Sequence, residues 1–160
     1  DEKISSNNYN IFIDGNNVLF FKNRQIVPES FQRLEIIFNL AKEHGNPLVI
    51  IHRRHKDFLK KNFGKDKSKE LKELLHRIQP NIFYTPYNMN DDWFFIWAGL
   101  TVKDSYIISN DKFRDHIFKI SEEDLISDSL TRWIENSIIR YKFLKKLYMC
   151  KIHMLKINLN

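Results

Sequence analysis

The feature that most constrains the fold is a short run of residues, Pro47 to Ile51, that is apolar on both faces. A strand with one face in water alternates apolar and polar residues, and this run does not alternate. Such a run suits a strand that is buried between two layers in a parallel sheet. Short apolar runs at 9–13, 82–84 and 105–109 predict companion strands.

Apolar residues at helical spacing lie between these strands. They predict helices over 28–44, 68–78, 91–102, 110–118 and 122–134. The tail over 138–159 predicts two strands that could form a hairpin. The alternation predicts an α/β fold of three layers, α/β/α, with a mostly parallel central sheet and a C-terminal β-rich tail. No long linker divides the chain, so we expect residues 1–160 to form a single domain.

The composition narrows the classes of function. The chain has 160 residues, a formal net charge of +6 and one cysteine, Cys150. A single cysteine excludes an internal disulfide framework and a cysteine-rich zinc site, so we expect no zinc site within the chain and a reducing, intracellular compartment. The sequence shows neither a membrane-spanning run nor a signal peptide, so we expect no membrane partner. The positive charge is compatible with nucleic acid, and equally with a solvated lysine-rich surface.

Four aspartates stand close to where predicted strands end. Asp14 follows the first strand, Asp91 and Asp92 follow the third after a short loop, and Asp111 follows the fourth. Because the carboxyl ends of parallel strands meet at one edge of a sheet, we expect these side chains to converge. Oxygen ligands alone favour Mg²⁺, with Mn²⁺ as the alternative. Such a site can activate water and neutralise charge on a phosphodiester.

Each of these residues also has a purely structural interpretation. Asp14 could belong to a turn, and Asp91, Asp92 or Asp111 could cap a helix. His116 could orient a metal-bound water or contact phosphate, and could equally be a half-buried helix residue.

Basic residues follow the second predicted strand directly. These residues are Arg53, Arg54, His55 and Lys56. They could hold phosphates that flank a scissile bond, or they could form a solvated loop. Trp93 and Trp97 lie four residues apart on a predicted helix, which favours burial over base stacking. We therefore expect the aromatic run to anchor the adjacent aspartates.

Several segments together resemble the NYN branch of PIN-like nucleases, and more narrowly the metallonuclease domain of protein-only RNase P. Ile13–Val18 resembles its D-G-x-N motif, and Asp91–Phe94 resembles its D-D-W-[YF] motif. Asn110–Phe118 resembles its N-D-x-x-R-D-H-[IL]-F motif. Trp133–Glu135 and Arg140–Phe143 resemble its later W-x-E and R-Y-x-F stretch, so the similarity covers nearly the whole chain.

The resemblance implies a PIN-like fold and an endonuclease that removes the 5′ leader from precursor tRNA, leaving 5′-phosphate and 3′-hydroxyl ends. By that match the catalytic and metal-site aspartates are Asp14, Asp91, Asp92 and Asp111, with His116 at the margin of the site. Asp91 and Asp92 are implied as direct ligands, and the other two aspartates act through water. The candidates for contacts to RNA are Arg53, Arg54, Lys56, Asn17 and Arg114. A mitochondrial, plastid or nuclear location is also implied.

The sequence departs from the family in two respects. Members usually carry an N-terminal helical-repeat region and a Cys/His zinc site, and this sequence shows neither; Ser137 stands where a zinc-binding histidine is expected. We therefore expect a separate RNA-binding module or protein subunit as a partner. Two other functions stay open, namely a PIN-like endoribonuclease acting on mRNA or rRNA and a non-catalytic RNA-binding subunit of a processing complex.

Overall fold

A computed structural model describes residues 8–20, 26, 28–55, 73–74, 76–122, 128–144 and 149–153. One sheet runs through this part of the chain in the order β3-β2-β1-β4-β5-β6. Its strands are β1 (Ile11–Asp14), β2 (Pro47–His52), β3 (Ile82–Thr85), β4 (Tyr106–Ile108), β5 (Ile138–Leu144) and β6 (Met149–His153). The first five strands are parallel, and β6 pairs antiparallel with β5.

This sheet confirms the predicted α/β fold with a mostly parallel sheet. The C-terminal tail forms the hairpin that the sequence allowed, since Tyr141 pairs with Ile152 across β5 and β6. One strand of that hairpin, β5, also belongs to the main sheet, which the sequence did not predict. Ile138 and Ile139 pair with Ile107 and Ile108 of β4, so β5 is the fifth parallel strand of the main sheet.

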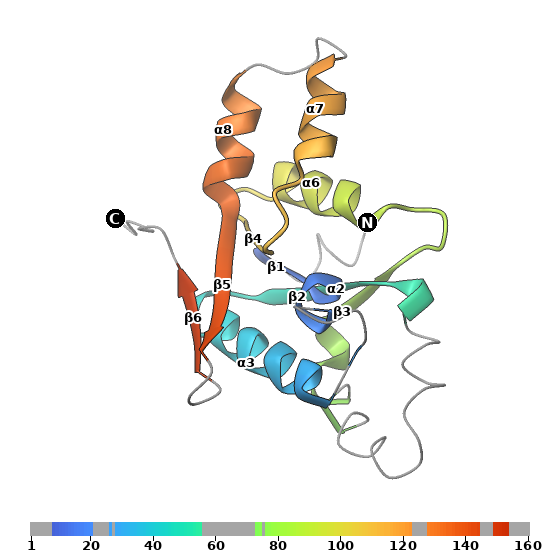
Figure 1. Ribbon diagram of the computed structural model, residues 1–160, viewed down its shortest axis with the longest axis vertical. Helices are drawn as coiled ribbons and strands as arrows, with labels where there is room; N and C mark the ends of the chain where they lie inside the picture. The colour runs from blue at the N-terminus through green and yellow to red at the C-terminus, as the bar shows by residue number, and fades with distance from the viewer. Residues whose placement is uncertain are drawn as a thin grey trace.

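Helices cover both faces of the sheet (Figure 1). They are α2 (Gly15–Leu19), α3 (Pro28–His44), the short 3-10 helix η1 (Gln79–Asn81), α6 (Asp91–Thr101), α7 (Arg114–Glu122) and α8 (Asp128–Ser137). Figure 1 shows α3 on one side of the sheet and α6 on the other, with α7 and α8 beyond it. Residues 73–74 and 76–78 are helical, and the rest of the helix predicted over 68–78 lies outside the described residues.

The side chains of the central strands alternate between two cores, which confirms the three layers. Ile13 and Ile51 belong to the cluster that packs against α3. Phe12 and Ile50 belong to the cluster that packs against α6, α7 and α8. Because β2 is fully buried on both faces, its apolar run has the environment that its composition predicts.

The helices α6 and α8 approach each other closely at Gly99. A Cβ atom on this residue would lie 2.3 Å from Cη2 of Trp133, far inside contact distance. The Ser105 hydroxyl also donates a hydrogen bond to the Gly99 carbonyl, at 3.1 Å. These two contacts fix the position of α6, whose first turn carries Asp91 and Asp92.

Three predictions for the helices differ from the structure. The segment after β1 forms the short helix α2, where a turn at Asp14 was expected. The helix predicted from residue 110 begins at Arg114, because Phe113 adopts a left-handed backbone with φ of 50° and ends the turn before it. The helix predicted over 122–134 continues to Ser137; it is described from Asp128, and residues 123–127 lie outside the described residues.

Candidate active site

The four aspartates face a single open hollow of about 370 Å³ at the carboxyl edge of the sheet. They reach it from three places: Asp14 ends β1, Asp91 and Asp92 begin α6, and Asp111 follows β4. The remaining lining residues are Asn16, Asn17, Phe20, Arg54 and His55. The structure therefore brings together the carboxylates that are far apart in the sequence.

Asp14 is buried and both of its carboxylate oxygens accept hydrogen bonds. It caps α2, since Oδ1 accepts from the backbone N–H of Asn17 at 2.9 Å. Its Oδ2 accepts from the Ser109 hydroxyl at 2.8 Å. Burial, with a smaller effect from the charges of Asp91 and Asp92, raises the pKa of Asp14 to about 7 despite these hydrogen bonds. Asp14 is thus both a helix cap and a buried carboxylate close to two others.

Asp91 and Asp92 occupy the first turn of α6, but neither is its cap. Asn90 is the cap, and its side chain accepts a hydrogen bond from the backbone N–H of Asp92 at 2.8 Å. The carboxamide of Asn16, on α2, donates to Oδ2 of Asp91. Burial and the neighbouring charge of Asp91 raise the pKa of Asp92 to about 6. The positive end of the α6 dipole favours this pair but does not remove the repulsion.

Asp111 is exposed at the mouth of the hollow and is held by backbone contacts. Its Oδ1 accepts from the backbone N–H of Phe113 at 2.8 Å, and its own N–H donates to the Ser109 hydroxyl at 3.0 Å. The guanidinium of Arg140 donates to the carbonyl of Asn110 at 2.5 Å. The Ser109 hydroxyl therefore links the segments that carry Asp14 and Asp111.

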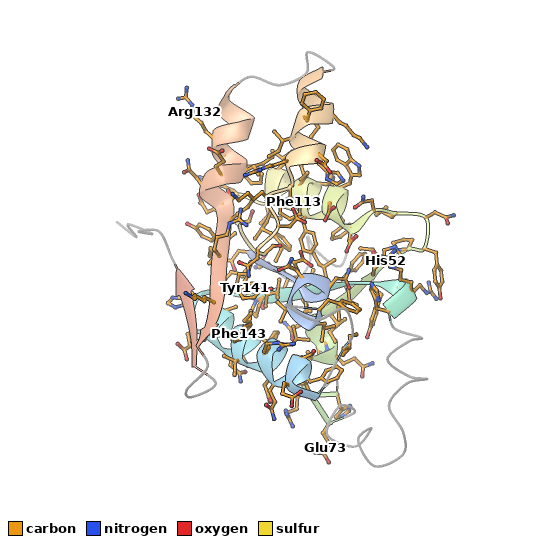
Figure 2. The ribbon with its side chains drawn as sticks, in the orientation of Figure 1. His52, Glu73, Phe113, Arg132, Tyr141 and Phe143 are labelled. Carbon is orange, nitrogen blue, oxygen red and sulfur yellow. The ribbon has the colours of Figure 1, made fainter. Side chains whose placement is uncertain are left out.

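Asn16 and Asn17 connect α2 to opposite sides of the site. Oδ1 of Asn16 accepts from the backbone N–H of His52 at 3.3 Å. Oδ1 of Asn17 accepts from the Tyr141 hydroxyl at 2.6 Å and from the backbone N–H of Asn110 at 3.1 Å. Figure 2 shows His52 and Tyr141 on either side of α2. These hydrogen bonds hold α2 between β2 and β5.

His116 lies behind Asp92, outside the residues that line the hollow. Its Nδ1 is 3.6 Å from Oδ2 of Asp92, and its Nε2 is 3.2 Å from the carboxamide nitrogen of Asn90. Its ring meets the indole of Trp93 edge-on, with centroids 4.9 Å apart. The geometry suits a side chain that orients Asp92.

The burial predicted for the two tryptophans of α6 was wrong. Trp93 is 38% exposed and Trp97 is 39% exposed. The buried residues of this helix are Phe94, Phe95 and Ile96, with Ala98 and Gly99. Spacing by four residues placed the tryptophans on one face, but that face points away from the sheet. The three residues between the tryptophans form the apolar anchor of the aspartate pair.

The predicted RNA-contacting residues lie in different places. Arg54 lines the hollow, and its backbone N–H donates to Nδ1 of His52 at 3.2 Å. Arg53 is exposed beside it, and Arg114 is exposed on the first turn of α7 without lining the hollow. Lys56 lies outside the described residues.

Sequence reasoning did not single out Asn16 or Ser109 as site residues. Both lie within the motifs around Asp14 and Asp111, and short polar side chains beside a strand-end carboxylate were the available signal. Tyr141 was noted only as part of the R-Y-x-F stretch and not as a site residue, because its hydroxyl reaches Asn17 from β5, with β4 lying between β5 and β1.

The residues around the hollow fit a divalent cation that keeps part of its water shell. Within the described part of the chain no three His, Cys, Asp or Glu side chains form a ready-made metal cluster. The hollow is nevertheless lined by carboxylate and carboxamide oxygens, which are the donors that Mg²⁺ prefers. Burial and, less strongly, the neighbouring carboxylates raise the pKa values of Asp14 and Asp92, and a bound cation would favour the charged form of both.

The five-stranded parallel sheet and the carboxylate-lined hollow at its carboxyl edge agree with the PIN-like fold that the sequence motifs predict. A family model for protein-only RNase P matches residues 4–157. The chain belongs to this family, whose members are metal-dependent nucleases.

Two curated relatives come from Arabidopsis thaliana. Proteinaceous RNase P 2 is 32% identical over 144 residues, which are 86% of this chain and 25% of the relative. Proteinaceous RNase P 3 is 30% identical over 144 residues, which are 86% of this chain and 23% of that relative. The chain thus spans about a quarter of the length of these relatives.

The fold is similar to solved structures of the same kind. The crystal structure of nuclear proteinaceous RNase P 2 from A. thaliana superposes with a TM-score of 0.69 at 24% identity, over 91% of this chain and 30% of that chain. A second structure, of A. thaliana nuclear protein-only RNase P 2, gives a TM-score of 0.63 at 29% identity, over 89% and 29% of the two chains. Among the described residues, no helix is long and apolar enough to cross a bilayer.

Proposed function

We propose that this domain is a magnesium-dependent endoribonuclease that removes the 5′ leader from precursor tRNA. It hydrolyses a phosphodiester and leaves 5′-phosphate and 3′-hydroxyl ends. The observation that carries the proposal is the gathering of Asp14, Asp91, Asp92 and Asp111 around one open hollow. Family membership supports the class of reaction and suggests a tRNA substrate.

Mg²⁺, or Mn²⁺, would be held by Asp91 and Asp92 directly and by Asp14 and Asp111 through water. Bound there, the ion would supply an activated water and neutralise charge on the scissile phosphate. The chain itself does the positioning. His116 orients the Asp92 carboxylate, and Ser109 holds Asp14 in place.

The RNA backbone meets basic side chains at the rim of the hollow. Arg54 and His55 line it on the β2 side, where they can contact the phosphates that flank the scissile bond. Asn17, Arg53, Lys56 and Arg114 are our other candidates for contacts to RNA. A separate RNA-binding module or protein subunit supplies the grip on the body of the tRNA.

The test is to incubate the chain with a leader-bearing precursor tRNA in Mg²⁺ and to map both product ends. We expect a cut at the mature 5′ end with a phosphate on the downstream product, and no cut in EDTA. A cut only in mRNA or rRNA from an RNA panel would move the proposal to another PIN-like substrate. RNA binding without a cut in any RNA would indicate a non-catalytic subunit.

A further inference from the structure

An arginine and a tyrosine meet on the surface beside the hollow. Cζ of Arg53 lies 5.7 Å from the centroid of the Tyr87 ring, a distance at which a cation and an aromatic face attract each other. Arg53 belongs to the short helical segment that follows β2, and Tyr87 to the loop between β3 and α6. These two segments lie side by side at the carboxyl edge of the sheet (Figure 1).

The backbone on both sides of this pair is held in place. The N–H of Arg54 donates to Nδ1 of His52, and the N–H of His52 donates to Asn16, which also contacts Asp91. In the other segment, the N–H of Met89 donates to the carbonyl of Pro86 at 3.2 Å and closes the loop. The pair is therefore presented from fixed positions.

The pair is continuous with the hollow along both segments. Arg54, the residue after Arg53, lines the hollow. Tyr87 lies in the loop that leads through the Asn90 cap to Asp91, which also lines it. A nucleotide next to one whose phosphate is in the hollow would reach Arg53 and Tyr87.

The chemistry of the pair suits a nucleobase. Tyr87 is 55% exposed although Arg53 stands over its ring, and Arg53 is itself exposed. Single-stranded nucleic acid is bound by aromatic and guanidinium planes that stack on bases, combined with positive charge for the phosphates.

We propose that Arg53 and Tyr87 form a stacking subsite for one base of the RNA strand that flanks the scissile phosphate. This inference rests on the proposed function in one respect, namely that RNA enters the hollow. The subsite binds any unpaired base and does not distinguish one base from another, because every base offers a flat face to the ring.

The first experiment measures binding of a fluorescein-labelled single-stranded oligoribonucleotide by anisotropy. Tyr87→Ala should weaken binding roughly tenfold, within the range known for loss of one base–aromatic stack. Tyr87→Phe is the matched control, since it keeps the ring, and should bind within about twofold of the unchanged protein. Arg53→Ala should also weaken binding and lower the salt dependence by about one unit of slope.

The second experiment moves the change from the protein to the RNA. Precursor tRNAs with a single abasic leader nucleotide, placed in turn at each position near the cut, should include one that binds the unchanged protein roughly tenfold less tightly. Tyr87→Ala should bind this abasic RNA as tightly as it binds the intact RNA, because the variant already lacks the ring on which the base would stack.

The outcomes separate the subsite from the proposed function. Equal binding of the oligoribonucleotide by Tyr87→Ala and the unchanged protein would overturn the subsite, whatever RNA is cut. Dependence on Tyr87 together with no cut at the mature 5′ end would retain the subsite and overturn leader removal. Additive losses from Tyr87→Ala and every abasic position would show that Tyr87 does not stack on a base near the cut.

Discussion

Asp14 and Asp92 face the same hollow, but the structure holds them in different ways. Asp14 is buried, and its two oxygens accept hydrogen bonds from Asn17 on α2 and from Ser109, directly after β4. The Asp92 side chain is 29% exposed, and its neighbouring basic group, His116, stands 3.6 Å away. The hydrogen bonds thus hold the Asp14 carboxylate in one orientation before any ligand binds, whereas the Asp92 carboxylate can reorient. A site that must bind a cation and then release a product can use both kinds.

The largest effect should come from removing the negative charge of Asp92, the less firmly held of the two carboxylates. Asp92→Asn keeps the size of the side chain but loses its negative charge, so we expect cleavage of precursor tRNA to fall at least about 100-fold. Single-turnover cleavage measures this, and circular dichroism checks the fold. Asp104→Asn is the matched control, because Asp104 is exposed outside the hollow and asparagine tolerates its φ of 55°. Near-normal turnover by Asp92→Asn would remove Asp92 from the chemistry.

The next largest effect tests the hydrogen bond that holds Asp14 in place. Ser109→Ala deletes the hydroxyl that donates to Asp14 and accepts from the backbone N–H of Asp111. We expect the free energy of unfolding to fall by about 2 kcal/mol, because a buried carboxylate oxygen loses its partner. Urea denaturation of the metal-free protein measures it. A loss below about 0.5 kcal/mol would mean that Asp14 is held by its other contacts.

A smaller effect concerns pH. The pKa of Asp92 is raised to about 6 in the folded protein from 3.8, so the folded form binds this proton more tightly than the unfolded form. This contribution to stability is present below about pH 4 and is lost as the pH rises through 6. Asp92→Asn lacks this titration, so in EDTA it should be more stable than the unchanged protein by about 1 kcal/mol at pH 8, after allowance for solvent screening.

Thermal melts in EDTA between pH 4 and pH 8 measure this difference. The two proteins should converge at the acid end of the range. Mg²⁺ at pH 8 should stabilise the unchanged protein more than Asp92→Asn, because only the former retains the full carboxylate site. Parallel pH profiles for the two proteins would contradict the raised pKa of Asp92.

The smallest effect belongs to His116. Its contact with Asp92 is 3.6 Å long and lies outside the hollow, so His116→Ala should lower the cleavage rate only about threefold. His116→Gln, which can still meet the Asn90 carboxamide, should be closer to normal. A fall of 100-fold in His116→Ala would place the imidazole in the chemistry itself.

The sheet and the convergence of the aspartates follow from local sequence signals. Leu48 to Ile51 are fully buried, as a run that is apolar on both faces requires. The parallel strands then carry Asp14 and Asp111 to one edge by topology alone. Nothing beyond the strand pattern and the polar residues that end each strand was needed.

The details around the carboxylates depend on contacts that the local sequence does not contain. Residues after Asp14 are turn formers by propensity, yet they form α2 because Asp14 caps it and Val18 and Leu19 are buried. The turn at Asp111 depends on Phe113, a bulky residue in a left-handed backbone that its burial supports. The contact between Asn16 and Asp91 joins two helices, α2 and α6, that are far apart in the sequence.

The close approach of α6 and α8 at Gly99 links the residues that can occur at positions 99 and 133. A methyl group on Gly99 would lie 2.3 Å from the Trp133 indole, so one side chain can grow only if the other shrinks. Since α6 moves as a rod, a shift at Gly99 would carry Asp92, about 10 Å along the helix, out of place. Among relatives, a larger residue at position 99 should therefore occur with a smaller one at position 133. In a mutagenesis library a larger residue at position 99 should survive only together with a smaller one at position 133.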